Sequence, residues 1–565
     1  MTLIRASRAA LAASVSLTML AGVAAPALAQ TGRPVQTETI AERGKPALIV
    51  TVVIDQFSAN LFNQYRSLYT SGLKTLSEQG LVSTNGYQTH GITMTCSGHA
   101  TVLTGAHPAR NGIAANDWID TKTGKYVYCL SAPQNRLAHG QDSDNGPVGP
   151  GNMQASTLGD WLKDVSPESR IFAVSGKDRG AIALNGHKGD GAYWLTNGFG
   201  FTTYVEPGQK AEERLAPVAA VNTRMAERFA KTPVSWTYTN EDCRRREGEW
   251  AIGNQVFHST VPPTALKMDT SPVLDELTMD GALELLETQQ LGRRGVTDML
   301  GVSLSATDRV GHTYGTQGPE MCEQMLALDH QLGRLLDKLS TIPGGVVLAL
   351  TADHGGSDFP ERTSVNGYPT SGRFDPTVLP RINAELKTRF NLSANPLVSS
   401  AKGFVVVDGN RIALPEPLRS QVIAAAVELL NEVPQIAMAV SRDELLAEPL
   451  PNSDHPDELS LRERLRLSAV AERAPDIMRA DQPGVTGSGR VGATIANHGS
   501  PWDYDRRVPI IFWWPNAIGQ ERFYPIRTVD MAPTLANLID VKPAAEIDGR
   551  CLDLPEFTTG KCRPE

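Results

Sequence analysis

An apolar run that ends in an aspartate is the feature that most restricts the fold of this chain. Residues 46–55 read PALIVTVVID, a nearly continuous apolar segment rich in β-branched side chains. Such a segment suits a strand buried on both faces, as in a parallel sheet covered by helices. Asp55 then falls at the carboxyl end of the strand, the edge where open α/β sheets bind their ligands.

The same construction occurs twice more. Residues 344–356, GGVVLALTADHGG, place Asp353 and His354 directly after a predicted strand. Residues 296–312, VTDMLGVSLSATDRVGH, place Asp308 just beyond another. Because the carboxyl ends of parallel strands share one edge of a sheet, these side chains are candidates for a common site.

Helical patterns alternate with the predicted strands. Residues 506–515, RRVPIIFWWP, predict a further buried strand, and residues 319–340 and 528–540 predict helices. We therefore expect an α/β fold with a mostly parallel central sheet, helices on both faces, and inserted cap or lobe elements. The insertions are expected at about 186–272 and 359–492.

The insertion at 359–492 has readable elements of its own. The segment GFVVVDGNRIAL predicts a hairpin with an Asp-Gly turn, and residues 418–431 predict an apolar helix.

The N-terminus is typical of a secretory signal. Arg5 and Arg8 precede an Ala-rich apolar run that ends in Ala-Leu-Ala before Gln30. Residues 1–29 are therefore predicted to be a signal peptide, and residues 30–565 a catalytic domain exported to the periplasm or the medium. No later segment is apolar enough for a membrane span, so no membrane association is expected after cleavage. The net charge of −9 and the lack of a Lys/Arg block give no reason to expect a nucleic-acid partner.

Export favours disulfides among the six cysteines. Cys551 and Cys562 are the easiest pair, and nearness in sequence makes pairs of Cys96 with Cys129 and of Cys243 with Cys322 plausible, although the connectivity stays open. The chain lacks a Cys-x-x-Cys pair that would indicate a thiolate zinc site.

Histidines and carboxylates at the ends of predicted elements indicate a metal site. Asp308 and His312 are four residues apart, so on a helix they share one face. Each candidate alone is weak, and the conjunction carries the inference. The candidate ligands are Asp55, Asp308, Asp353, His312, His354 and His498. This mixed set without cysteine suits Zn²⁺, and two groups of ligands suit a two-metal hydrolase.

The order of the motifs points to a family. VVIDQF, TMTCSGHATVLTG, HPARNGIAANDW, SGKDRGA, DRVGH, TADHGG and NHGSPWDYDRRVPIIFWWP follow one another along the chain. The set resembles the alkaline phosphatase superfamily, most closely its PafA-like bacterial alkaline phosphatases, over most of the mature chain. The resemblance implies two zinc ions and a nucleophile at the start of a helix, which here is Thr95. It implies the following ligands: Asp55, Thr95, Asp353 and His354 for one ion, and Asp308, His312 and His498 for the other.

Four neighbouring residues are candidate nucleophiles: Thr93, Thr95, Cys96 and Ser97. Zinc coordination can activate a threonine hydroxyl, and a following helix N-terminus offers N–H donors to phosphate. Related sulfatases modify a Cys, but their pattern needs Pro or Ala two residues later and Arg four later. Gly98 and Ala100 occupy those places, so a sulfatase is disfavoured. Thr95 is the preferred nucleophile, with Ser97 second.

The phosphate-binding residues are read mainly from the resemblance. Lys177 and Arg179 are two apart and in extended structure would face one way, although such a pair alone suits a solvated surface. The resemblance implies that both residues, with Asn116, contact phosphate oxygens. A Lys/Arg clamp favours the more highly charged monoester. Lys177 stands where other alkaline phosphatases keep a magnesium site, so magnesium is not expected.

The resulting expectation is an exported zinc alkaline phosphatase that hydrolyses small-molecule phosphate monoesters through a phosphothreonine intermediate. A phosphodiesterase or nucleotide pyrophosphatase of the same superfamily is the alternative enzyme. An exported metal- or phosphate-binding protein without turnover is the alternative of another class.

Overall fold

A ten-stranded, mostly parallel sheet organises the part of the chain that the structure describes. The computed structural model describes residues 44–140, 146–196, 200–232, 234–261, 268–544, 546–552 and 562. The predicted signal peptide lies outside these residues. The strand order is β21 (Gln520–Arg522), β2 (Leu81–Tyr87), β20 (Arg507–Trp513), β13 (Val346–Thr351), β1 (Leu48–Ile54), β12 (Asp298–Leu304), β6 (Ile171–Ser175), β7 (Gly191–Thr196) and β8 (Gly200–Thr202), with β22 (Ile526–Arg527) beside β2.

The centre of the sheet is parallel and its flanks are mixed. Strands β13, β1, β12, β6 and β7 run parallel, whereas β20 is antiparallel to both β13 and β2. Strand β8 returns antiparallel beside β7. The predicted α/β class with a mostly parallel sheet is confirmed.

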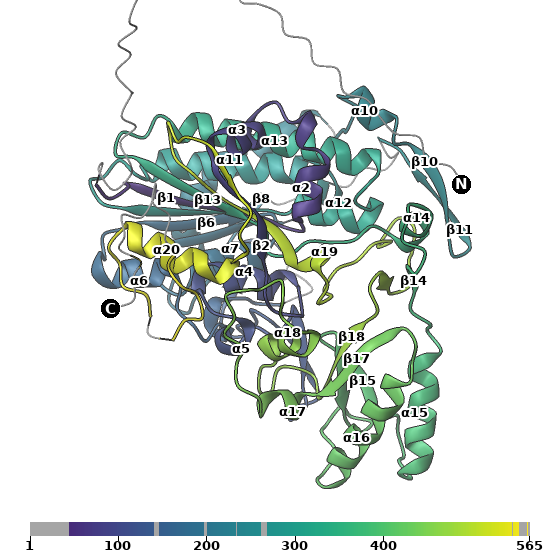
Figure 1. Cartoon of the computed structure of the whole chain (residues 1–565). Coiled ribbons are helices and arrows are strands. Elements are labelled where there is room, and N and C mark those ends of the chain that lie inside the picture. The colour runs from purple at the N-terminus through teal and green to yellow at the C-terminus, as the bar shows by residue number, and fades with distance from the viewer. Residues whose placement is uncertain are drawn as a thin grey trace, which may run out of the picture. The chain divides into compact units, whose positions relative to one another are not determined.

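Helices bury both faces of this sheet (Figure 1). Leu48, Val50 and Val52 of β1 pack with α2 (Ala59–Gln64), α3 (Gly72–Gln79), α11 (Val273–Thr288), α12 (Ala306–Tyr314) and α13 (Pro319–Leu339). Ile49 and Val53 point the other way, toward α4 (Thr95–Thr104), α6 (Leu158–Val165) and α20 (Met531–Leu538). Because alternate residues enter two different cores, the strand must be apolar at every position.

The register brings the strand ends to one line. Ile54 pairs with Leu304, and Val53 pairs with Thr351. On the far side of β12, Ser303 pairs with Ser175. The residues that follow β1, β13, β12 and β6 therefore emerge side by side at the carboxyl edge.

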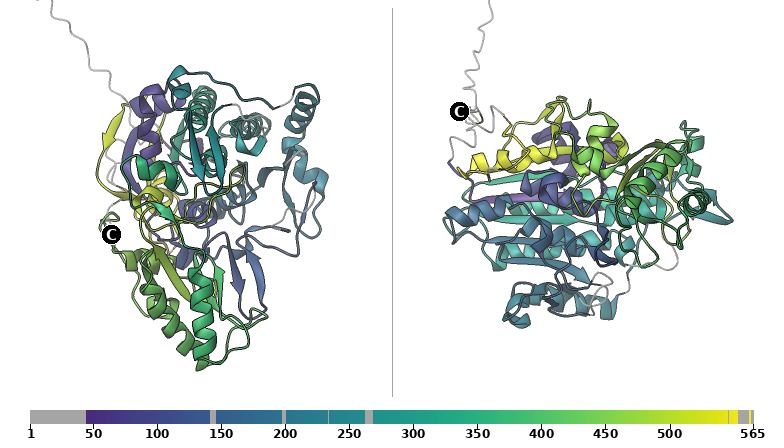
Figure 2. Two further views of the ribbon diagram at one scale, coloured as in Figure 1. Left: turned by 90° about the vertical axis from the view of Figure 1, so that its right-hand side faces the viewer. Right: turned by 90° about the horizontal axis from the view of Figure 1, so that it is seen from below.

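A second, antiparallel sheet lies within residues 359–492. Its order is β15 (Leu397–Ser400), β16 (Gly403–Val406), β18 (Ile477–Asp481) and β17 (Ile436–Ser441). Helices α15 (Val378–Arg389) and α16 (Leu418–Asn431) pack on it and lie side by side in Figure 2. The predicted helix at 418–431 is confirmed. We call this sheet and its two helices the lobe.

The predicted Asp-Gly hairpin does not form a regular two-stranded ladder. Strand β16 pairs with the preceding β15 and with β18. After the turn, a single bridge joins Val407 to Ala413 in the described chain. Pro415 and Pro417 follow, and a proline has no N–H with which to extend a ladder.

Residues 186–272 contribute to the main sheet and to a peripheral layer. Strands β7 and β8 belong to the central sheet. Beyond them come α8 (Ala211–Leu215), α9 (Ala219–Lys231), α10 (Glu241–Arg244) and the hairpin of β10 (Gly248–Ile252) and β11 (Gln255–Ser259). The exact limits of both insertions stay predictions.

Short elements complete the described chain. They are η1 (Arg66–Leu68), α5 (Pro108–Asn111), β3 (Asp117–Asp120), β4 (Lys125–Tyr128), β5 (Arg136–Leu137), η2 (Pro150–Asn152), α7 (Asp178–Asn185), β9 (Tyr204–Val205), η3 (Ala216–Val218), η4 (Met268–Thr270), α14 (Pro360–Val365), β14 (Gly372–Arg373), α17 (Arg442–Leu446), α18 (Leu461–Ser468), β19 (Val485–Thr486), α19 (Asp503–Arg506) and η5 (Thr528–Asp530). No helix among the described residues is long and apolar enough to cross a bilayer.

All three cysteine pairings expected from the sequence are present. The disulfides join Cys96 to Cys129, Cys243 to Cys322, and Cys551 to Cys562. The first of them ties the opening turn of α4 to the residue after β4.

A single carboxylate anchors α3 to α13. The Asp329 oxygens, 2 % exposed, accept hydrogen bonds from the backbone N–H groups of Thr70, Ser71, Leu73 and Lys74. These are the donors that a helix N-terminus leaves without partners.

We predict that Asp329→Ala lowers the free energy of unfolding by about 1–3 kcal/mol, because it removes the acceptor of four backbone N–H groups, of which that of Leu73 is buried. Urea denaturation followed by circular dichroism measures the change. The control is Asp337→Ala on the same helix, where the side chain is exposed. Equal midpoints for the two variants would contradict this role for Asp329.

Candidate active site

Lys177 lies between two buried carboxylates at the carboxyl edge of the sheet. Its Nζ is 2.5 Å from Asp55 Oδ2, at the end of β1, and 2.5 Å from Asp308 Oδ2, in the first turn of α12. The three side chains are at most 4 % exposed. The lysine therefore offsets negative charge that would otherwise be costly to bury.

Three histidines present the same nitrogen to these carboxylates. The Nδ1 atoms of His312, His354 and His498 lie 2.8–2.9 Å from backbone carbonyl oxygens. A carbonyl only accepts, so each Nδ1 carries the proton and each Nε2 keeps its lone pair. This is the arrangement found in metal-binding histidines.

The Nε2 atoms point to the acidic oxygens. Those of His312 and His498 are 3.2 and 3.4 Å from Asp308 Oδ1. That of His354 is 3.4 Å from Asp55 Oδ1 and 3.5 Å from Asp353 Oδ2.

Unpartnered buried atoms show that this donor set fits a cation. Asp55 Oδ1, Asp308 Oδ1 and His354 Nε2 are buried and have no hydrogen-bond partner among the described residues. Two groups of ligand atoms each lie within 4.8 Å of one another: Asp308, His312 and His498, and Asp55, Asp308 and His354. Asp308 belongs to both groups, and Asp353 lies beside His354. Oxygen and imidazole donors without thiolate suit zinc-like divalent ions.

Most of the candidate ligands are in the protonation state that metal binding requires. Burial lowers the pKa of His354 to about 3, and burial also lowers the pKa of His498, so both rings are neutral at pH 7. Burial alone would raise the pKa of Asp308, but Lys177 and His312 hold it well below its usual range. Burial would lower the pKa of His312, but Asp308 outweighs it and the pKa is raised.

Thr95 is the first residue of α4 and is 1 % exposed. The helix approaches the end of β13 so closely that a Cβ on Gly98 would lie 2.1 Å from the Asp353 carbonyl oxygen. Only glycine permits this packing, which sets Thr95 and the helix N–H groups beside the strand edge.

The three competing nucleophiles are engaged elsewhere. Cys96 is in a disulfide. The Ser97 hydroxyl donates to the carbonyls of Ile92 and Met94, and the Thr93 hydroxyl donates to that of Ser500.

His99, which the sequence analysis does not single out, links the helix that begins at Thr95 to Asp353. Its Nδ1 is 3.0 Å from both the Thr95 carbonyl oxygen and Asp353 Oδ2, and its Nε2 is 2.9 Å from Ser303 Oγ. The spacing of four residues from Thr95 on a helix was the available signal.

Lys402 is a second residue that sequence reasoning missed. It lies in the β15–β16 turn of the lobe, and its Nζ donates to the His498 carbonyl oxygen at 2.7 Å. Burial lowers the pKa of this lysine. No local pattern connects it with a histidine 96 positions away.

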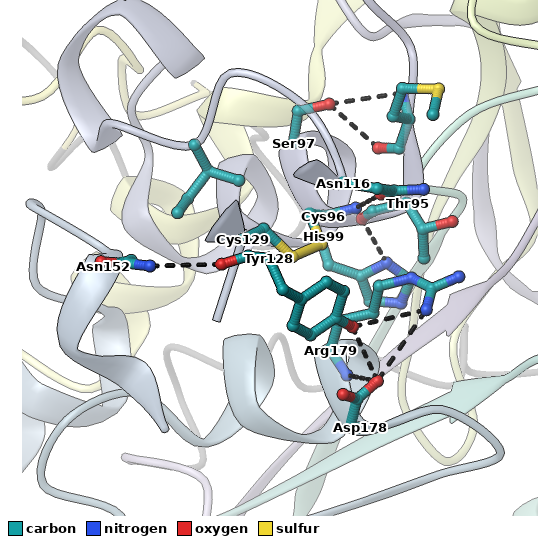
Figure 3. Close-up of a disulfide and its surroundings, with 12 residues drawn as sticks. Thr95, Cys96, Ser97, His99, Asn116, Tyr128, Cys129, Asn152, Asp178 and Arg179 are labelled. Atoms are coloured by element: carbon teal, nitrogen blue, oxygen red, sulfur yellow. Dashed lines mark hydrogen bonds and ion pairs between the residues drawn. A yellow bond between two sulfur atoms is a disulfide. The ribbon is translucent and has the colours of Figure 1, made fainter. Parts of the chain in front are cut away.

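The predicted phosphate ligands take different places (Figure 3). Asn116 Oδ1 accepts from the Cys96 N–H at 2.9 Å, at the N-terminus of α4. Arg179 lies on the first turn of α7, with Nη1 3.8 Å from Asp178 Oδ1 and 3.5 Å from the Tyr128 hydroxyl.

The expectation that Lys177 and Arg179 share one extended segment is wrong. Lys177 has an extended backbone, with φ −132° and ψ 141°, but α7 begins at Asp178. The two-residue alternation of a strand therefore ends at Lys177 and does not relate its side chain to that of Arg179. Lys177 reaches the carboxylates, whereas Arg179 lies beside Tyr128 and Asp178.

The fold and this site define a class of enzyme. Residues 49–501 match the family described as type I phosphodiesterase / nucleotide pyrophosphatase. The chain belongs to this family, which is part of the alkaline phosphatase superfamily. It is thus an enzyme of the alkaline phosphatase/phosphodiesterase superfamily.

Individual relatives carry phosphatase names. The chain is 38 % identical to alkaline phosphatase PhoD of Zymomonas mobilis subsp. mobilis, over 91 % of this chain and 89 % of the relative. It is 36 % identical to alkaline phosphatase PhoK of Sphingomonas sp, over 92 % of each. The crystal structure of alkaline phosphatase PafA superposes with a TM-score of 0.75 at 25 % identity, covering 88 % of this chain and 96 % of that one.

We predict that the affinity for Zn²⁺ falls with acidification, by up to about tenfold per pH unit below the His312 pKa. The pKa of His312 is raised, so below it a proton must leave before the ring can bind. Calorimetric titration of chelator-treated protein between about pH 6 and about pH 8 measures this. His312→Ala should remove most of the dependence, and His330→Gln, at an exposed position, should keep it. An affinity independent of pH would argue against the ligand assignment.

Proposed function

We propose that this protein is an exported alkaline phosphatase that hydrolyses phosphate monoesters through a phosphothreonine intermediate at a two-zinc site. The observation that carries the proposal is the position of Thr95, at the N-terminus of a helix packed directly on the strand end that bears Asp353 and His354. Kinship with alkaline phosphatases supports it. Export rests on the predicted signal peptide at residues 1–29.

The ligands are those that the sequence suggested. Asp55, Thr95, Asp353 and His354 would hold one zinc ion, and Asp308, His312 and His498 the other. Zinc at these positions would lower the pKa of the Thr95 hydroxyl and offset charge on the departing oxygen.

Thr95 does the covalent chemistry. Its hydroxyl gives up its proton to water, and Oγ1 forms a bond to phosphorus in line with the ester oxygen. The bond between phosphorus and that oxygen breaks, and the leaving oxygen takes up a proton from water and departs as the alcohol. A water molecule then attacks the phosphothreonine, releasing inorganic phosphate and restoring Thr95.

The surrounding donors stabilise the transferring group. The N-terminus of α4 directs the positive end of its helix dipole to the phosphate. Asn116 and Arg179 bind equatorial oxygens, whose charge is spread in the transition state. Lys177, held between Asp55 and Asp308, supplies a further positive charge to the site.

Phosphodiester hydrolysis is the second candidate, because the matching family is described by that activity. A diester carries one negative charge where a monoester carries up to two, so it gains less from Lys177 and Arg179. The relative rates on the two esters decide between the candidates.

We predict that Thr95→Ala lowers the turnover of p-nitrophenyl phosphate by at least about a thousand-fold, because the nucleophile is lost. Thr95→Ser should keep measurable turnover, because it retains a hydroxyl at the same place. Both variants should melt at the wild-type temperature. Full activity in Thr95→Ala would exclude Thr95 as the nucleophile.

Arg179→Ala tests the choice of ester. We expect kcat/KM for p-nitrophenyl phosphate to fall by about 100-fold or more, as for other lost transition-state donors. The rate on bis-p-nitrophenyl phosphate should change much less. A wild-type enzyme that prefers the bis ester, or an equal loss on both esters, would favour the diesterase.

A further inference from the structure

Tyr128 lies beside Arg179 and has no part in the chemistry above. It is the last residue of β4, and its hydroxyl donates to Asp178 Oδ1 at 2.8 Å. The Tyr128 hydroxyl oxygen in turn accepts from Arg179 Nη1 at 3.5 Å. The phenol has one proton, which it donates in the hydrogen bond to Asp178. Its oxygen can therefore only accept from the guanidinium of Arg179.

Tyr128, Asp178 and Arg179 each contact the other two (Figure 3). Asp178 Oδ1 also accepts the backbone N–H of Arg179 at 2.8 Å. The side chains of Asp178 and Arg179 are 9 % and 16 % exposed, so water screens these contacts little. Without the Tyr128 hydroxyl, Arg179 Nη1 loses its hydrogen-bond acceptor and keeps only the longer, 3.8 Å ion pair with Asp178.

The backbone of Tyr128 is tied to the nucleophile helix. The next residue, Cys129, is bonded to Cys96, the neighbour of Thr95. The Cys129 N–H donates to the Asn116 carbonyl at 2.9 Å, and the Cys96 N–H donates to the Asn116 side chain at 2.9 Å. The Asn152 amide holds the Tyr128 carbonyl at 3.3 Å.

We propose that Tyr128 is a positioning residue that sets the preference for monoesters by holding Arg179 in a fixed orientation. The Cys96–Cys129 disulfide fixes the position of Tyr128 relative to Thr95, because it joins the residues that follow each of them. The inference rests on the proposed function. Arginine recognises phosphate by directed N–H groups as well as by charge, so a rotated guanidinium loses contacts. Because the monoester has more charge to share with Arg179, it loses more than the diester.

The test is a double-mutant cycle of Tyr128→Phe and Arg179→Ala on the zinc-loaded full chain. We expect Tyr128→Phe to lower kcat/KM for p-nitrophenyl phosphate by about tenfold, the size of one buried hydrogen bond. It should weaken inhibition by inorganic phosphate by a similar factor and change the bis ester by less than about twofold. In the Arg179→Ala background it should have no further effect.

The control variant is Tyr126→Phe, two residues earlier on β4, where the side chain is 55 % exposed. It should behave as wild type. The paired disulfide variants give a second readout: Cys96→Ser/Cys129→Ser should shift the monoester/diester ratio as Tyr128→Phe does, whereas Cys243→Ser/Cys322→Ser should leave the ratio unchanged.

Several results would overturn the inference. One is an equal loss on both esters, and another is the same loss with and without Arg179, since either describes a merely structural tyrosine. Should Tyr128→Phe not fold, Asp178→Asn replaces it and must show the same selective loss. An active wild type with an unchanged Tyr128→Phe rejects only the role of Tyr128. A zinc-loaded wild type without monoester turnover rejects the proposed function as well.

Discussion

The contact of Lys177 with Asp55 and Asp308 is the constraint on which the rest of the site depends. It joins the ends of β6, β1 and β12, so three strands must be in register for one ammonium group to reach two carboxylates. Buried charges persist only when they are paired or bind ions. The apolar strands, the helices on both faces and the close packing of α4 all serve to hold charge where water is excluded.

Much of the fold and of the candidate site could be predicted, because the sequence patterns that indicate them span only a few neighbouring residues. The apolar run before Asp55 specified a strand buried on both faces, and the four-residue spacing of Asp308 and His312 specified one face of a helix, as found in α12. The cysteine pairings followed from nearness in sequence. The family match over residues 49–501 and the likeness to the PafA structure agree with this fold.

The remainder depended on where helices begin and on distant contacts. The extended backbone considered for Lys177 to Arg179 does not continue past Lys177, because α7 begins at Asp178. Tyr128 reaches Arg179 across 51 positions. Such contacts are made by the tertiary fold, and pattern reasoning over a short window does not contain them.

The lysine in the β15–β16 turn has a consequence for shortening this protein. The lobe has a hydrophobic core of its own, which makes it an obvious target for deletion, although β17 and β18 also pack with Ile92, Ala114 and Ala115. Its turn nevertheless supplies the hydrogen bond to the His498 carbonyl. A version without the lobe would therefore lose the hydrogen bond that supports the loop bearing His498, and a new support for that loop would be the first task of redesign.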